Sequence, residues 1–164
     1  MTNLLALLLS LAWGWGCTVG CALAGVRGFV FLAMAALPLL LWARYSPGKR
    51  AVLAAVGAAC VPGFVLPSGL AACVGTAVLL AAVVQTIFKA VPARGFFACT
   101  LLGAFQTMLL LLPALFLCAW SGPTLSQESL GWAVTGSFAC GASFALLERR
   151  VRASSSLRHA LQRP

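Results

Sequence analysis

The sequence predicts an all-α, polytopic integral membrane protein built as a bundle of six transmembrane helices. Two observations predict this class. Apolar residues make up 62% of the 164 residues and charged residues only 8%, whereas a soluble domain has about a quarter of its residues charged. The apolar residues also form long stretches separated by Gly, Pro or basic residues. With so little polar surface, the chain suits a lipid bilayer rather than water.

Six apolar stretches are the expected helices, in chain order 4–25, 28–43, 50–66, 69–88, 95–119 and 129–147. A helix needs about 20 residues to cross the hydrocarbon core. The second and third stretches are close to the lower limit, and the fifth is long enough to tilt. The first stretch begins MTNLLALLLS without a basic residue, so we expect a retained helix rather than a cleaved signal peptide.

The third and fourth stretches need a separate argument, because no charge occurs between Ala51 and Phe88. As one helix this run would be roughly 55 Å long, while the hydrocarbon core is about 30 Å thick. Pro62 removes one backbone donor, and Pro-Ser-Gly at 67–69 combines a second proline with turn-forming residues. The run is therefore expected to turn back near 67–69 as two antiparallel helices.

The distribution of basic residues supports six helices. With six, ten of the eleven Lys and Arg residues fall on one side, and only Arg27 falls on the other. The positive-inside rule then places both termini in the cytoplasm. Five helices would separate the clusters at 44–50 and 89–94. We assign residues 1–148 to the transmembrane domain and 149–164 to a basic cytoplasmic tail.

Arg149, Arg150 and Arg152 of this tail are expected to contact anionic membrane lipids. The net charge of +9 does not indicate nucleic acid, because the basic residues fall in short clusters between apolar stretches.

Residues able to carry chemistry are scarce. The chain has no Asp, its two Glu residues, Glu128 and Glu148, are expected near opposite faces of the membrane, and its one His is His159 in the tail. Paired carboxylates, a Ser/His pair or a metal site are therefore not expected. None of the seven Cys residues forms a Cys-x-x-Cys motif, and we interpret them as packing residues. The sequence predicts neither an enzyme nor a cofactor.

Small and amide residues are the candidates for helix contacts. Gly16 and Gly20 form a G-x-x-x-G motif, which lets a neighbouring backbone approach closely. Gly136 lies in a looser ladder with Gly131 and Gly141, and Gln106 lies near the centre of the fifth stretch. These residues would contact either a partner protein or the other helices of the bundle, and Gln106 could instead line a path for a ligand.

Three stretches resemble the rod-shape-determining membrane protein family MreD: GVRGFVFLAMAALPLLLWA, GKRAVLAAVGAACVPGFVLPSGLAACVGTAVLLAAVVQTIFK and LGWAVTGSFACGASFALLERRVR. The resemblance lies in the order and spacing of short-looped helices and in the Arg-rich end. One departure is CVPGFVLPSG, which lacks the acidic residue that the family often has near the end of its third helix.

The resemblance implies a non-enzymatic scaffold of the bacterial cell-shape (elongation) machinery, integral to the cytoplasmic (inner) membrane. It implies a bitopic partner similar to MreC and, through it, MreB and peptidoglycan synthases. It also implies a six-helix arrangement similar to the substrate-binding subunits of energy-coupling-factor transporters.

Two alternatives remain open. One is a small-molecule-binding subunit of a transporter, which requires a cavity reached from the loop 121–129. The other is an accessory subunit of a respiratory or secretion complex. A solid bundle with an exposed small-residue groove along Gly16–Gly20 would favour the scaffold over the carrier.

Overall fold

The computed structural model describes residues 2–46, 48–65, 69–91, 95–121 and 127–154, and these ranges contain only helices and their connections. The all-α prediction is confirmed. The elements are α1 (Thr2–Ala24), the short 3-10 helix η1 (Gly25–Gly28), α2 (Phe29–Met34), α3 (Leu37–Tyr45), α4 (Lys49–Val65), α5 (Gly69–Ala90), α6 (Phe96–Ser121) and α7 (Gln127–Ala153). With α2 and α3 taken as one broken segment, the described ranges form six helical segments.

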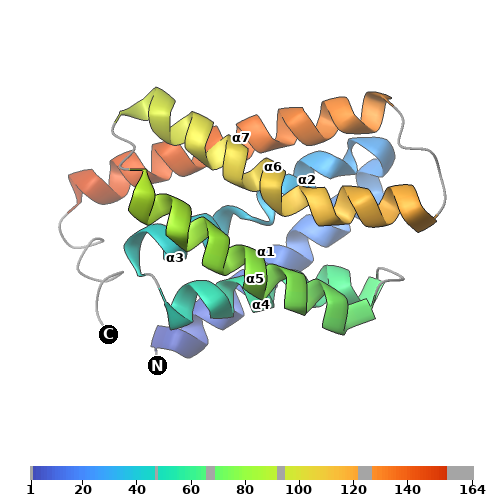
Figure 1. Cartoon of the computed structure of the whole chain (residues 1–164), viewed down its shortest axis with the longest axis horizontal. Helices are drawn as coiled ribbons and strands as arrows, with labels where there is room; N and C mark the ends of the chain where they lie inside the picture. Colours follow the sequence, from blue (N-terminus) through green and yellow to red (C-terminus); the bar gives the residue numbers. More distant parts are fainter. Residues whose placement is uncertain (1, 47, 66–68, 92–94, 122–126, 155–164) are drawn as a thin grey trace.

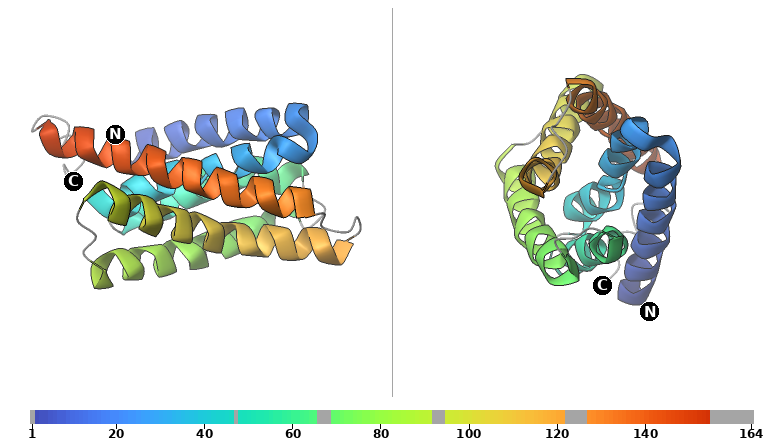
Figure 2. Two further views of the ribbon diagram at one scale, coloured as in Figure 1. Left: turned by 90° about the horizontal axis from the view of Figure 1, so that it is seen from above. Right: turned by 90° about the vertical axis from the view of Figure 1, so that its right-hand side faces the viewer.

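Successive segments run in opposite directions, so the start of α1 and the end of α7 lie at the same end of the bundle (Figure 1). Seen end-on, α3 lies near the middle, with the longer helices around it (Figure 2). Its position agrees with the burial of Leu37, Leu39, Leu40 and Ala43. A short, apolar segment thus forms the centre of the molecule.

The uncharged run 51–88 is two antiparallel helices, as predicted. α4 ends at Val65 and α5 begins at Gly69, and the two helices pack against each other. α4 continues through position 62, so the first proline does not end the helix. Residues 66–68 themselves lie outside the described ranges.

The second segment differs from the prediction of one helix over 28–43. It is two short helices joined at Ala35 and Ala36, and the cause is Pro38. Proline has no N–H to donate to the carbonyl four residues earlier, which is that of Met34. The indole Nε1 of Trp13 in α1 donates to this oxygen instead, at 2.8 Å. A neighbouring helix therefore satisfies the carbonyl that the proline leaves without a donor.

Glycines allow the closest helix approaches. A Cβ at Gly141 of α7 would lie 2.7 Å from the Ala104 nitrogen of α6, and a Cβ at Gly103 would lie 3.0 Å from the Gly141 Cα. A Cβ at Gly57 of α4 would lie 3.0 Å from the Leu7 carbonyl oxygen of α1. These positions bring backbones into direct contact, as small residues do in membrane helix pairs.

Two helices are long and apolar enough to cross a membrane within the described ranges, Asn3–Ala24 and Leu130–Ala153. The other apolar helices in these ranges are shorter: Phe29–Tyr45, Val74–Ala90 and Phe96–Leu112. Six membrane crossings therefore remain a prediction.

Candidate functional site

The C-terminal ends of α3 and α7 lie at the same end of the bundle, which we call the basic end. It carries most of the described basic residues: Arg44, Lys49, Arg50, Lys89, Arg149, Arg150 and Arg152. Glu148 is the one acidic residue there. Its side chain is only 3% exposed, and its Oε1 lies 3.2 Å from Arg44 Nε and 2.6 Å from Arg152 Nη2. The Tyr45 hydroxyl donates to the Glu148 carbonyl oxygen at 3.4 Å. This cluster joins α3 to α7.

Four-residue spacing positions this cluster on α7. Phe144, Glu148 and Arg152 follow one another at intervals of four, so they share one face of the helix. The Phe144 ring contacts the Phe88 ring of α5 with centroids 5.6 Å apart, and the Arg44 guanidinium lies 5.7 Å from the Phe88 centroid. The charged cluster therefore packs against the rings of Phe88 and Phe144, which cover part of it from water.

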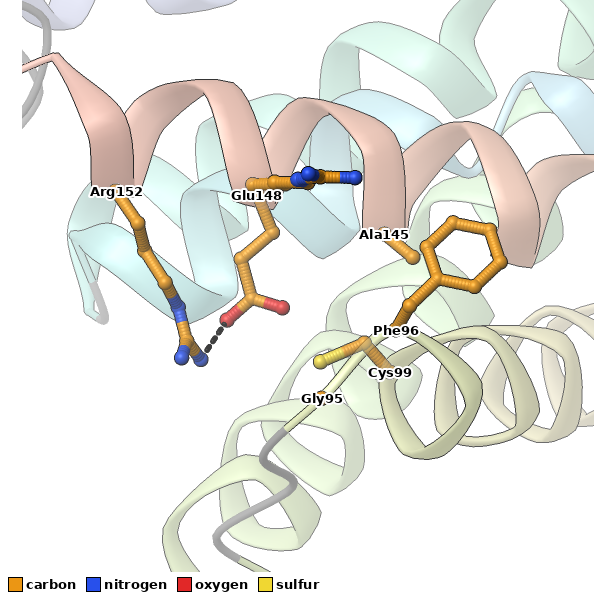
Figure 3. A pocket seen from close by; sticks show the side chains of 7 residues that line it. Gly95, Phe96, Cys99, Ala145, Glu148 and Arg152 are labelled. Atoms are coloured by element: carbon orange, nitrogen blue, oxygen red, sulfur yellow. Dashed lines mark hydrogen bonds and ion pairs between the residues drawn. The ribbon is translucent and has the colours of Figure 1, made fainter.

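A cavity of about 340 Å³ adjoins the cluster. Phe96 and Cys99 of α6 form one side, and Ala145, Glu148, Arg149 and Arg152 of α7 form the other. Figure 3 shows the Glu148 and Arg152 side chains extending from α7 towards the start of α6, with Cys99 opposite. Charged and apolar groups thus border the same space.

Arg50 organises a second polar cluster at the basic end. The residue is only 5% exposed, and its Nε donates to Asn3 Oδ1 at 3.1 Å and its Nη1 to Ser46 Oγ at 3.3 Å. Its guanidinium also lies 5.8 Å from the Trp42 ring centroid. These contacts, all with neutral groups, tie the start of α1 to α3 and α4.

The predicted glycine contacts divide between the inside and the outside of the bundle. A Cβ at Gly20 would lie 2.7 Å from the Phe31 ring, and one at Gly136 would lie 2.7 Å from the Val30 Cα, so both glycines pack against α2. Gly16 is exposed, and a Cβ there would meet no atom within 4 Å. The motif at 16–20 therefore contributes one glycine to the bundle and leaves the other on its surface.

Gln106 is fully buried and links α6 to α5. Its Nε2 donates to the Val84 carbonyl oxygen at 3.5 Å, while its Oε1 has no hydrogen-bond partner within the described part of the chain. The adjacent Thr107 donates to the Gly103 carbonyl oxygen within α6. Thr107, but not Gln106, borders a mainly apolar cavity of about 130 Å³ beside the α2–α3 break.

The predicted lipid-contact arginines are all on α7, which runs to Ala153, beyond the domain boundary placed at 148. All three arginines are exposed, and Arg152 also bonds to Glu148. Of the three, Arg149 and Arg152 border the 340 Å³ cavity. Sequence reasoning missed the Arg44–Glu148 pair, for which the available signal was a single acid close to a basic cluster.

Groups of three or more metal-ligating side chains are absent from the described ranges. Comparison with protein-family models, with curated proteins and with solved structures found no match. The resemblance to the MreD family remains a prediction.

Proposed function

We propose that the chain is an integral membrane protein of six crossings that acts as a non-enzymatic scaffold, by binding other membrane proteins of the cell-shape machinery. The observation that carries this proposal is the apolar outer surface. Leu79 is 69% exposed, Phe105 is 60% exposed and Phe138 is 50% exposed, each on a different helix. Soluble proteins rarely expose apolar patches of this extent, whereas lipid chains would cover them.

The placement of charge supports the same environment. Among the described residues, Arg27 and Glu128 lie at the end opposite to the basic end, and the other charged side chains lie at the basic end. Charges at both ends and none between them are typical of a chain that crosses a bilayer. The excess of arginine at one end is the bias that marks the cytoplasmic side.

The separation of the two carboxylates supports binding rather than catalysis. Glu128 and Glu148 belong to the same helix, α7, and at about 1.5 Å per residue they lie roughly 30 Å apart. Glu148 is also engaged by two arginines. An acid–base pair acting on one substrate needs both groups within hydrogen-bond reach of it.

An exposed stripe on α1 is the surface that we assign to a partner helix. Its members recur at intervals of three and four residues, so they share one face: Leu5, Leu9, Ala12, Gly16, Val19 and Leu23. Ala12 and Gly16 form a shallow centre where another backbone could approach, between larger apolar side chains. A single-pass helix, such as that of the MreC-like partner implied by the sequence resemblance, fits this face.

Copurification tests the scaffold. The tagged chain would be extracted in mild detergent and its co-eluting proteins identified, for the wild type, Gly16→Leu and the control Gly75→Leu. Gly75 is also an exposed helical glycine whose Cβ would meet no atom within 4 Å. We expect an MreC-like protein with the wild type and with Gly75→Leu, and a loss with Gly16→Leu. Equal recovery with all three would reject the α1 face, and absence of any such protein would reject the function.

The small-molecule carrier receives less support from the cavities. The cavity beside the α2–α3 break, at about 130 Å³, is smaller than ligand pockets of about 300 Å³ and above. The 340 Å³ cavity lies at the basic end, whereas the loop expected to admit a ligand, 121–129, joins α6 to α7 at the opposite end. Residues 122–126 of that loop lie outside the described ranges.

A further inference from the structure

We propose that the 340 Å³ cavity between α6 and α7 binds the phosphate group of an anionic phospholipid, with Arg149 and Arg152 as its donors. This inference rests on the membrane placement in the proposed function, but it does not depend on the scaffold role. It assigns a defined site to one lipid, in place of a general attraction between a basic tail and the membrane surface.

Charge balance is the first argument. Among the described residues, Glu148 is the only carboxylate at the basic end, and one of its oxygens already contacts both Arg44 and Arg152. The chain's other acid, Glu128, lies at the opposite end of α7. Within the described ranges no carboxylate forms an ion pair with Arg149, and the described side chains that line the cavity, with one glutamate and two arginines, carry a net positive charge. A counter-charge from outside the protein would be attracted there, more strongly than at a fully hydrated surface.

The arrangement of Arg152 is the second argument. Its Nη2 is held by Glu148 at 2.6 Å, and Glu148 is itself held by Arg44 from α3. A guanidinium carries five N–H donors in a planar fork, so Arg152 can bond to a phosphate oxygen in addition to the partners that it has within the protein. The buried carboxylate thus acts as a positioning group that orients the arginine beside the cavity.

The apolar part of the lining favours a lipid over a free phosphate ion. Phe96 and Ala145 border the same cavity as the arginines. The neighbouring Phe97, at the start of α6, is 81% exposed. A phospholipid supplies an anionic group and acyl chains together, whereas inorganic phosphate would leave the apolar surface uncovered. Basic pockets between membrane helices on the cytoplasmic side are typical sites for anionic headgroups.

Arg150 offers a matched control within the same helix. It is exposed and carries the same charge as Arg149, but it does not border the cavity. Diffuse attraction to an anionic surface would depend equally on the two arginines. A defined site would depend on Arg149.

The experiment measures lipid binding to the purified full-length chain in detergent by native mass spectrometry. Phosphatidylglycerol and phosphatidylcholine would be titrated onto the wild type, Arg149→Gln, Arg149→Lys and Arg150→Gln. We expect the wild type to prefer phosphatidylglycerol, Arg149→Gln to bind it about fivefold more weakly, and Arg150→Gln to stay within about twofold of the wild type. Arg149→Lys should recover part of the affinity, because it restores the charge.

Three outcomes would overturn the site. Equal losses for Arg149→Gln and Arg150→Gln would show diffuse attraction, and equal affinity for the two lipids would show that the net negative charge of the headgroup is not recognised. Displacement of phosphatidylglycerol by inorganic phosphate at millimolar concentration would show that a soluble anion is the ligand. Fractionation of the chain into the soluble phase would instead reject the membrane placement, so the two failures are distinguishable.

Discussion

Gly141 of α7 lies directly against the backbone of α6, and its replacement tests how much that contact contributes to stability. A Cβ there would lie 2.7 Å from the Ala104 nitrogen, a backbone atom that cannot move aside alone. We expect Gly141→Ala to separate the two helices and lower the free energy of unfolding by about 1–3 kcal/mol. Gly131→Ala in the same helix is the control, since its Cβ would meet no atom within 4 Å. Thermal unfolding in detergent should show a lower Tm for the first variant only.

Glu148 provides the second test at this scale. Glu148→Gln removes the counter-charge of Arg44 and Arg152, while Glu128→Gln alters an exposed side chain at the opposite end. We expect the first variant to lose about 1–3 kcal/mol of stability and the second to change little. Equal Tm values for the two variants would mean that the ion pairs do not hold α3 against α7.

Sequence reasoning identified some of these residues but not their environments. Gln106 was chosen as a buried amide, and it does join two helices. Gly16 and Gly20 were chosen as a pair, yet only Gly20 faces another helix. When every face of a helix is apolar, periodicity does not indicate which face points inward. The Trp13–Met34 bond was missed because it depends on which helix neighbours the broken segment.

At the scale of elements, the break between α2 and α3 has a cause that a double-mutant cycle can isolate. Trp13→Phe keeps an aromatic ring but removes the N–H that satisfies the Met34 carbonyl, and we expect a cost of about 1 kcal/mol. Pro38→Ala supplies a backbone N–H at the position that normally bonds to Met34 in a continuous helix. In the Pro38→Ala background, Trp13→Phe should lower the free energy of unfolding by distinctly less, because the new backbone N–H can bond to the Met34 oxygen. Identical losses of Tm in both backgrounds would contradict the idea that the Trp13 N–H replaces the backbone N–H that Pro38 lacks.

Helix positions were more predictable than helix continuity. The expected stretch 4–25 corresponds to α1 and the stretch 69–88 to α5, because apolar runs and turn residues mark both clearly. The division of the run 51–88 into two helices was predicted from its length, and the place of the turn from Pro-Ser-Gly at 67–69. The second stretch was expected to be continuous although Pro38 lies inside it, since a proline permits either a kink or a break. Packing around α3, which the sequence does not display, decides between them.

At the scale of the whole molecule, the apolar outer surface would face lipid in a membrane protein and water in a soluble one. Arginine substitutions on that surface distinguish the two cases. Phe138 lies near the middle of α7 and is 50% exposed, whereas Leu147 lies near the basic end. An arginine at the centre of a membrane helix costs about 2.5–3.5 kcal/mol in insertion, and much less near an end. Phe138→Arg should therefore reduce the amount of chain in the membrane fraction, and Leu147→Arg should not. If both variants accumulate equally there, the bundle does not cross the bilayer as proposed.

Composition predicts a membrane environment for this molecule but does not predict its function. The 62% apolar content and the clustered arginines are the basis of the proposed membrane placement. A binding role depends on surface shape, such as the α1 stripe around Gly16, and this becomes visible only when the inward and outward faces are known. The proposed lipid site likewise depends on which two of the three arginines border a cavity, and the sequence does not show this.

The bond between Trp13 and the Met34 oxygen has a consequence for the order of assembly during translation. The ribosome releases residues from the N-terminus, so the indole donor is made before the proline that creates the need for it. When the second segment leaves the ribosomal tunnel, its unsatisfied oxygen meets a donor already in place. The compensation therefore requires only the first two segments and does not depend on the synthesis of the whole bundle.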